Sequence, residues 1–83
     1  DIEKVRPYYK DSLVSKCLSE NEKKEYDGDF ASLWCKKEAY AKLTGEGILT
    51  YPSNIDTLLC GCKFELMRFF YEESAYVIAA AAK

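Results

Sequence analysis

Residues Phe30–Thr44, FASLWCKKEAYAKLT, decide the fold, because they form the strongest helical segment in the chain. Two aromatic and two charged residues recur every four positions, and a helix would stack them along one ridge: Phe30, Trp34, Glu38 and Lys42. A carboxylate held at the edge of a core, with lysines within a turn, is suited to a site for a metal ion and a phosphate. Alternatively, Glu38 and Lys42 form an ordinary i,i+4 ion pair on a solvated helix.

The residues on either side of this segment indicate where the helix begins and ends. The sequence Asp27-Gly28-Asp29 breaks the preceding pattern, and Asp29 is placed to cap a helix that starts at Phe30. Gly45 is placed to end the helix in the left-handed conformation. The glycines of Gly45-Glu46-Gly47 follow a helix instead of preceding one, so they do not have the arrangement of a phosphate-binding loop.

Two shorter helices are expected before the central one. Pro7 can open the first, and apolar residues recur at helical spacing from Tyr8 to Leu18. Ser19 and Glu22 have the spacing of a capping box, which predicts a short polar helix that runs to about Tyr26. The charged residues of this second helix are most simply a solvated face.

Strands are expected at both ends of the chain. After a loop over Ile48–Asp56, apolar and charged residues alternate in Lys63–Tyr71, and Ala75–Ala82 continues as a second strand beyond a turn. The alanines of that strand would let the central helix pack closely on the sheet. At the start, Asp1 and Glu3 alternate with Ile2, so an extended segment would place both carboxylates on one face. The chain is therefore predicted to be α+β, with a short antiparallel sheet packed against helices on one face.

Length and composition favour one small folded domain. The chain has 83 residues, of which 48% are hydrophobic and 31% are charged, and these are values typical of globular proteins. Its net charge is −2 and it has no basic block, which argues against binding to nucleic acid or to an anionic membrane surface. No apolar run approaches the roughly 20 residues of a membrane-spanning helix, and a cytoplasmic location is expected.

The cysteine and histidine content narrows the chemistry. The chain has four cysteines, Cys17, Cys35, Cys60 and Cys62, with no C-x-x-C pair and no histidine. A zinc site and a Ser-His-Asp arrangement are therefore not expected. All four cysteines are expected to be reduced and mostly buried. None is predicted to be a catalytic nucleophile, because no histidine is present to act as its base.

The central helix carries the most specific pattern in the chain. The run from Trp34 to Lys42, WCKKEAYAK, followed by Gly45-Glu46-Gly47, resembles the W-x-x-K-E-A-x-x-K…G-x-G stretch of the 4'-phosphopantetheinyl transferases. Asp1-Ile2-Glu3 resembles the acidic D-x-E that this family places at a strand end. The spacing between these two motifs is similar to that in the C-terminal half of the larger, Sfp-type members. The resemblance covers nearly the whole chain, so residues 1–83 are expected to form one such domain. It implies one half of the transferase fold, with the upstream half expected to precede Asp1.

The resemblance also implies a reaction and a set of site residues. The 4'-phosphopantetheine group of coenzyme A would be moved to a serine of an acyl or peptidyl carrier protein. Asp1, Glu3 and Glu38 would be Mg²⁺ ligands, with Glu38 also the candidate base for the serine proton. Lys37 and Lys42 would contact the phosphates of coenzyme A, and Lys42 would be a catalytic residue together with Glu38.

Two further expectations follow from the resemblance. Part of the coenzyme A pocket would come from the upstream half, so the chain alone is expected to be inactive, and a homo-oligomer is possible. A different function stays open, namely that of a non-catalytic interaction or structural domain that has kept the transferase fold.

Overall fold

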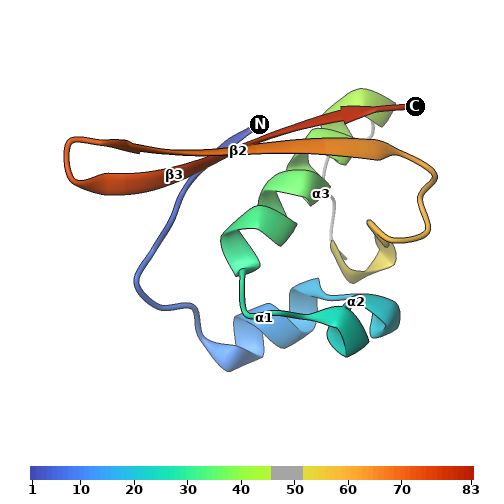
Figure 1. The fold of residues 1–83 in the computed structure, drawn as a ribbon. Helices are drawn as coiled ribbons and strands as arrows, with labels where there is room; N and C mark the ends of the chain where they lie inside the picture. The colour runs from blue at the N-terminus through green and yellow to red at the C-terminus, as the bar shows by residue number, and fades with distance from the viewer. Residues whose placement is uncertain (46–51) are drawn as a thin grey trace.

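A computed structural model describes residues 1–45 and 52–83 of the chain (Figure 1). The elements follow in this order: strand β1 (Ile2–Lys4), helices α1 (Asp11–Cys17), α2 (Glu20–Glu25) and α3 (Phe30–Thr44), a 3-10 turn η1 (Pro52–Asn54), and strands β2 (Lys63–Tyr71) and β3 (Ser74–Ala82). The predicted α+β class is thus confirmed. Within the described ranges, no helix has the length and apolar character needed to cross a membrane.

The three strands form one antiparallel sheet in the order β1-β3-β2. A tight turn joins β2 to β3, and its two central residues, Glu72 and Glu73, both have positive φ, of 48° and 65°. Two consecutive positive φ values are typical of the turns that match the twist of a hairpin. Figure 1 shows α3 against the sheet, with α1 and α2 beyond its N-terminal end.

Small side chains form the core between α3 and the sheet. One buried cluster joins α3 to β3, and its members are Ala31, Cys35, Ala39, Val77 and Ala79. Small side chains on α3 and β3 allow the helix to pack closely on the strand. Close packing stabilises the fold, because each buried atom then makes many van der Waals contacts. The role expected for alanine in the last strand is confirmed at Ala79, which is buried under the helix.

The ends of α3 agree with the prediction. Asp29 accepts a hydrogen bond from the backbone N–H of Ser32 at 3.2 Å, as a capping residue should. At the other end, Gly45 has a φ of 76°, and its N–H donates to the carbonyl of Lys42. The capping box of Ser19 and Glu22 is also present at the start of α2.

One expected boundary is wrong. Helix α1 begins at Asp11 instead of near Tyr8, because the chain is still extended at Lys10, where φ is −62° and ψ is 138°. Tyr9 nevertheless packs against Phe30, with ring centroids 5.0 Å apart, so its apolar character reflects tertiary packing of a loop. The loop expected over Ile48–Asp56 lies partly outside the described residues, and its last part contains η1.

The face of the sheet opposite α3 is largely uncovered. Ile2 pairs with Ile78, which pairs with Met67 on the other side, and directly opposed residues share a face of the sheet. Val77 is buried beneath α3, so its neighbour Ile78 points to the other face. Ile2 and Met67 are 55% and 63% exposed. An apolar row therefore crosses the sheet on its uncovered side.

Candidate active site

Strand β1 presents its acidic residues to α3. Glu3 is opposite Val77, whose side chain is buried under α3, so the Glu3 side chain lies on the helix face of the sheet. There it lines a small pocket together with Phe30 and Trp34 of the ridge. Asp1 is two residues away and shares this face. Both carboxylates of the D-x-E segment therefore point toward the central helix, as predicted.

An ion pair joins β1 to the far end of the ridge. The ammonium of Lys42 contacts the carboxylate of Asp1. Glu3 lies beside Trp34 and Asp1 lies beside Lys42, so the strand runs past the helix in the opposite direction. Glu38, midway between Trp34 and Lys42 along the ridge, occurs between these two contacts. The Lys42 side chain is 66% exposed, and its ammonium is open to further ligands.

The buried thiol of Cys35 contacts the N-terminal segment. Burial is the main reason that the pKa of Cys35 is raised, and the charges of Glu3 and Glu38 act in the same direction. The Cys35 thiol itself donates to the carbonyl oxygen of Asp1 at 3.1 Å, which fixes the start of β1 on α3.

The three predicted metal ligands are not gathered around one point. Among residues 1–45 and 52–83, no group of three acidic, cysteine or histidine side chains is close enough to hold a metal ion. In this arrangement the Asp1 carboxylate is paired with Lys42, and the assignment of Asp1, Glu3 and Glu38 as Mg²⁺ ligands stays a prediction. The donor set still fits Mg²⁺ in its chemistry, because this ion binds carboxylate oxygens and completes its shell with water and phosphate.

Lys37 occupies a very different place from Lys42. Its side chain is fully buried, and its ammonium lies 2.7 Å from Oε1 of Glu22. The same ammonium donates to the carbonyl oxygens of Pro52, at 2.9 Å, and Ile55, at 2.6 Å. All three partners are oxygens of the protein itself. The expectation that Lys37 contacts a phosphate is therefore wrong for this arrangement. Its side chain is not exposed, and its ammonium already has three protein partners.

Glu22 completes this buried cluster, which we call the clamp: Glu22, Lys37, Thr57 and the carbonyl groups of Pro52 and Ile55. Its Oε1 also accepts the backbone N–H of Ser19, and its Oε2 accepts both the N–H and the hydroxyl of Thr57, at 2.9 and 2.7 Å. Burial alone would raise the pKa of Glu22, but the hydrogen bonds from Lys37, Ser19 and Thr57 together hold it below its usual value. The carboxylate is thus kept ionised opposite the ammonium.

Only part of the clamp could be predicted from local sequence patterns. The capping box predicts Glu22 at the start of α2. That role accounts for one oxygen of its carboxylate and predicts no partner for the other. The second oxygen is used by Thr57, which is 35 positions away in the chain. A buried lysine so far from its partners leaves no periodic pattern that would distinguish it from a solvated one.

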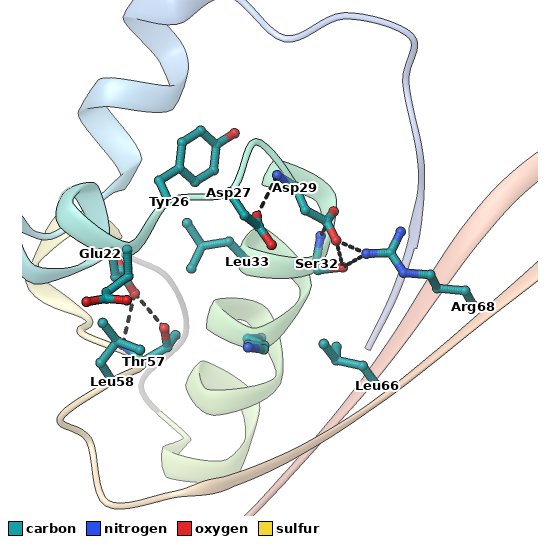
Figure 2. Close-up of a pocket in the computed structure, with 12 residues that line it drawn as sticks. Glu22, Tyr26, Asp27, Asp29, Ser32, Leu33, Thr57, Leu58, Leu66 and Arg68 are labelled. Carbon is teal, nitrogen blue, oxygen red and sulfur yellow. Dashed lines mark hydrogen bonds and ion pairs between the residues drawn. The ribbon is translucent and has the colours of Figure 1, made fainter.

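A second polar group lies at the start of α3, in a pocket of about 290 Å³ between that helix and β2. Figure 2 shows Arg68 of β2 pointing toward Asp29 and Ser32. The guanidinium is paired with the Asp29 carboxylate and donates to the Ser32 hydroxyl at 2.9 Å. Leu33 and Leu66 add apolar surface to the same pocket. Arg68 therefore ties β2 to the capped end of α3, a role that the alternating pattern of the strand did not indicate.

Comparison with known proteins bears on the same region. The family model described as the 4'-phosphopantetheinyl transferase superfamily matches residues 1–80. The chain belongs to the 4'-phosphopantetheinyl transferase superfamily. The match includes the D-x-E segment of β1 and the whole of α3. No curated protein and no solved structure matches the chain.

Membership in the 4'-phosphopantetheinyl transferase superfamily confirms the family that the motif of α3 suggested, and the observed fold is consistent with half of the transferase fold. It supports a function of the phosphopantetheinyl transferase type in general. Within this framework, the exposed ammonium of Lys42 and the acidic residues of β1 are the candidate reactive groups, and the clamp is internal support for the helix.

Proposed function

We propose that this chain takes part in the Mg²⁺-dependent transfer of 4'-phosphopantetheine from coenzyme A to a serine of an acyl or peptidyl carrier protein. The observation that carries the proposal is the pairing of Lys42 with Asp1, which joins the W-x-x-K-E-A-x-x-K helix to the D-x-E strand. The superfamily match over residues 1–80 supports the reaction class.

Each residue of the site has a proposed role. Asp1, Glu3 and Glu38 would hold Mg²⁺, which supplies positive charge to the pyrophosphate oxygens when it is bound. The hydroxyl oxygen of the carrier serine attacks phosphorus, and Glu38 accepts the proton of that hydroxyl. Lys42, whose ammonium is exposed, binds phosphate oxygens of coenzyme A. Adenosine 3',5'-bisphosphate is the leaving group.

The clamp contributes without touching the substrate. Lys37 and Glu38 are adjacent in α3, and successive residues of a helix are turned by about 100°. Lys37 therefore points into the clamp while Glu38 belongs to the ridge. Because Lys37 is bonded to α2 and to the segment around η1, the clamp fixes the rotation of α3 and with it the direction of the ridge.

We further propose that the site is completed by a second half that precedes Asp1. The uncovered apolar row of Ile2, Ile78 and Met67 supports this, since packing of another surface there would remove it from water. The isolated chain is then expected to fold without catalysing the transfer. A second copy of the chain is the other candidate for covering the same face.

One observation favours a different function. The carboxylates of Asp1, Glu3 and Glu38 do not form a metal-holding group among the described residues, as would be expected of a non-catalytic interaction domain that has kept the fold. Such a domain would bind a carrier protein or another partner without modifying it.

A carrier-protein mass assay tests the proposal. The chain is produced alone and also joined to the proposed upstream half, and each form is incubated with an apo carrier protein, coenzyme A and Mg²⁺. We expect the joined form to add one phosphopantetheine to the carrier, and the chain alone to add none. Binding of the carrier by the joined form without any gain in mass would support the interaction domain instead. Transfer by the chain alone would overturn the requirement for a second half.

A further inference from the structure

The four cysteines fall into two classes in the structure. Cys17 and Cys35 are 5% and 0% exposed, and the thiol of Cys35 donates to the carbonyls of Asp1 and Val77. Cys60 and Cys62 are only partly buried, and all four are free thiols. The expectation of burial holds for Cys17 and Cys35 but not for Cys60 and Cys62. An accessible pair remains that the proposed transferase site does not use.

Cys60 and Cys62 are separated by a single glycine at the entry to β2. Gly61 has a φ of 75°, and no atom lies within 4 Å of the place where a Cβ would be. Two Cα–Cα steps of about 3.8 Å allow at most about 7.5 Å between the flanking Cα atoms, and a bend at the glycine shortens this toward the range of about 4.4–6.8 Å that disulfides require. The backbone is therefore able to bring the two sulfur atoms together.

The Cys60 thiol lies next to Cys62 and also contacts the segment that forms the clamp. The pKa of Cys62 is raised. The main cause is partial burial, and the neighbouring Cys60 thiol adds to it. The Cys60 thiol also lies 3.7 Å from the carbonyl oxygen of Thr57, as a donor to it. Thr57 is the residue that binds Glu22 in the clamp. The pair thus occupies the junction between the clamp and strand β2.

We propose that Cys60 and Cys62 form a redox-active dithiol, which closes to a disulfide by exchange with a low-molecular-weight disulfide such as oxidised glutathione. One thiol loses its proton, and its sulfur attacks the small disulfide to form a mixed disulfide and release one small thiol. The second thiol then loses its proton, and its sulfur displaces the other small thiol. The protein loses two electrons and two protons, and the small disulfide is reduced to two thiols.

The reaction is expected to be reversible and dependent on pH. Thiolate is the attacking species, so the raised pKa of Cys62 means that closure becomes faster as the pH rises toward that pKa. A disulfide between partly exposed residues remains accessible to added thiols, which reopen it. The buried Cys17 and Cys35 should not take part, because neither presents its sulfur to solvent.

Mass spectrometry of the folded chain tests this proposal, and it does not depend on transferase activity. The protein is treated with oxidised glutathione, free thiols are alkylated after unfolding, and peptides are mapped. We expect a Cys60–Cys62 disulfide without bound glutathione, and alkylation of Cys17 and Cys35. Cys60→Ser and Cys62→Ser are matched controls, and each should retain one glutathione on its remaining exposed thiol. Glutathione on both cysteines of the wild-type chain, no oxidation of either, or a disulfide to Cys17 or Cys35 would overturn the proposal.

Discussion

The Lys37 ammonium and the Glu22 carboxylate lie 2.7 Å apart, and their side chains are 0% and 1% exposed. The two residues come from different helices, so the pair joins α2 to α3 at the back of the ridge. Every buried side-chain nitrogen and oxygen atom in the described residues has a hydrogen-bond partner, and the clamp supplies several of these bonds. A buried pair satisfied in this way is costly to break from one side only.

Removing the ammonium should therefore destabilise the chain. In Lys37→Met, Glu22 is left as a buried charge, and two carbonyl groups lose their donor, so we expect a loss of about 3–5 kcal/mol in the free energy of unfolding. Lys36→Ala is the matched control, because Lys36 is partly exposed and its ammonium lies 5.8 Å from the centre of the Phe64 ring. It should cost no more than about 1 kcal/mol. Denaturant unfolding of both variants measures the difference, and equal losses would contradict the role of the clamp.

Stability should also fall in acid. The pKa of Glu22 is lower in the folded chain than its ordinary value of 4.5, so folding favours its ionised form. This contribution is fully present above the unfolded pKa and is lost as the pH falls through the lower, folded value. Thermal unfolding midpoints between pH 6 and pH 3 should show the decline, and the slope should be shallower in Glu22→Gln. An unchanged slope in that variant would assign the acid sensitivity to other carboxyl groups, such as that of Asp56, whose pKa is also lowered.

The cap of α3 offers a separate test of local stability. Asp29 both accepts the N–H of Ser32 and pairs with Arg68. Asp29→Ala removes both interactions and should cost about 1–2 kcal/mol, whereas Asp29→Asn keeps the cap and should lose less than about 1 kcal/mol, since Arg68 is largely exposed. Denaturant midpoints compare the two variants. If asparagine were as damaging as alanine, the ion pair, and not the cap, would dominate.

The local features of the fold could be predicted from sequence. Helix α3 was predicted with its observed ends because Asp29 and Gly45 are a cap and a stop that act within one turn. Strand β2 was predicted because its alternation has period two. Helix α1 was placed too early, since Tyr9 is held by Phe30 and not by helical periodicity.

The site was harder to predict, since side-chain contacts between distant segments decide it. The motif predicts a site formed by α3 and the D-x-E segment, which the Lys42–Asp1 pair brings together, but it could not show which lysine is buried. Lys37 and Lys42 look alike in sequence, yet one contacts Glu22 inside the protein and the other contacts Asp1 at the surface. That difference depends on the segment from Pro52 to Thr57, which supplies the oxygens around Lys37 and the donors to Glu22.

Lys42 should affect substrate binding without affecting folding. In the form joined to the proposed upstream half, Lys42→Ala would remove the proposed charged hydrogen bond to phosphate, worth about 1.5–3 kcal/mol, and should lower kcat/KM for coenzyme A by roughly 10- to 100-fold. Lys42→Arg keeps the charge and should recover part of the loss. Unfolding curves of the two variants should stay close to that of the wild type, because the Lys42 side chain is mostly exposed. A large loss of stability in Lys42→Ala would mean that the lower kcat/KM comes from a damaged fold and not from a lost phosphate contact.

The most direct test of the account is the carrier-protein mass shift produced by Glu38→Gln, in the form joined to the proposed upstream half, with coenzyme A and Mg²⁺. Glutamine keeps the shape of the side chain but can neither accept the serine proton nor bring a negative charge to the metal. We predict that phosphopantetheine transfer is lost in Glu38→Gln and retained in Lys36→Ala, while both variants remain folded. Transfer by Glu38→Gln at the wild-type rate would contradict the assignment of the ridge as the active site.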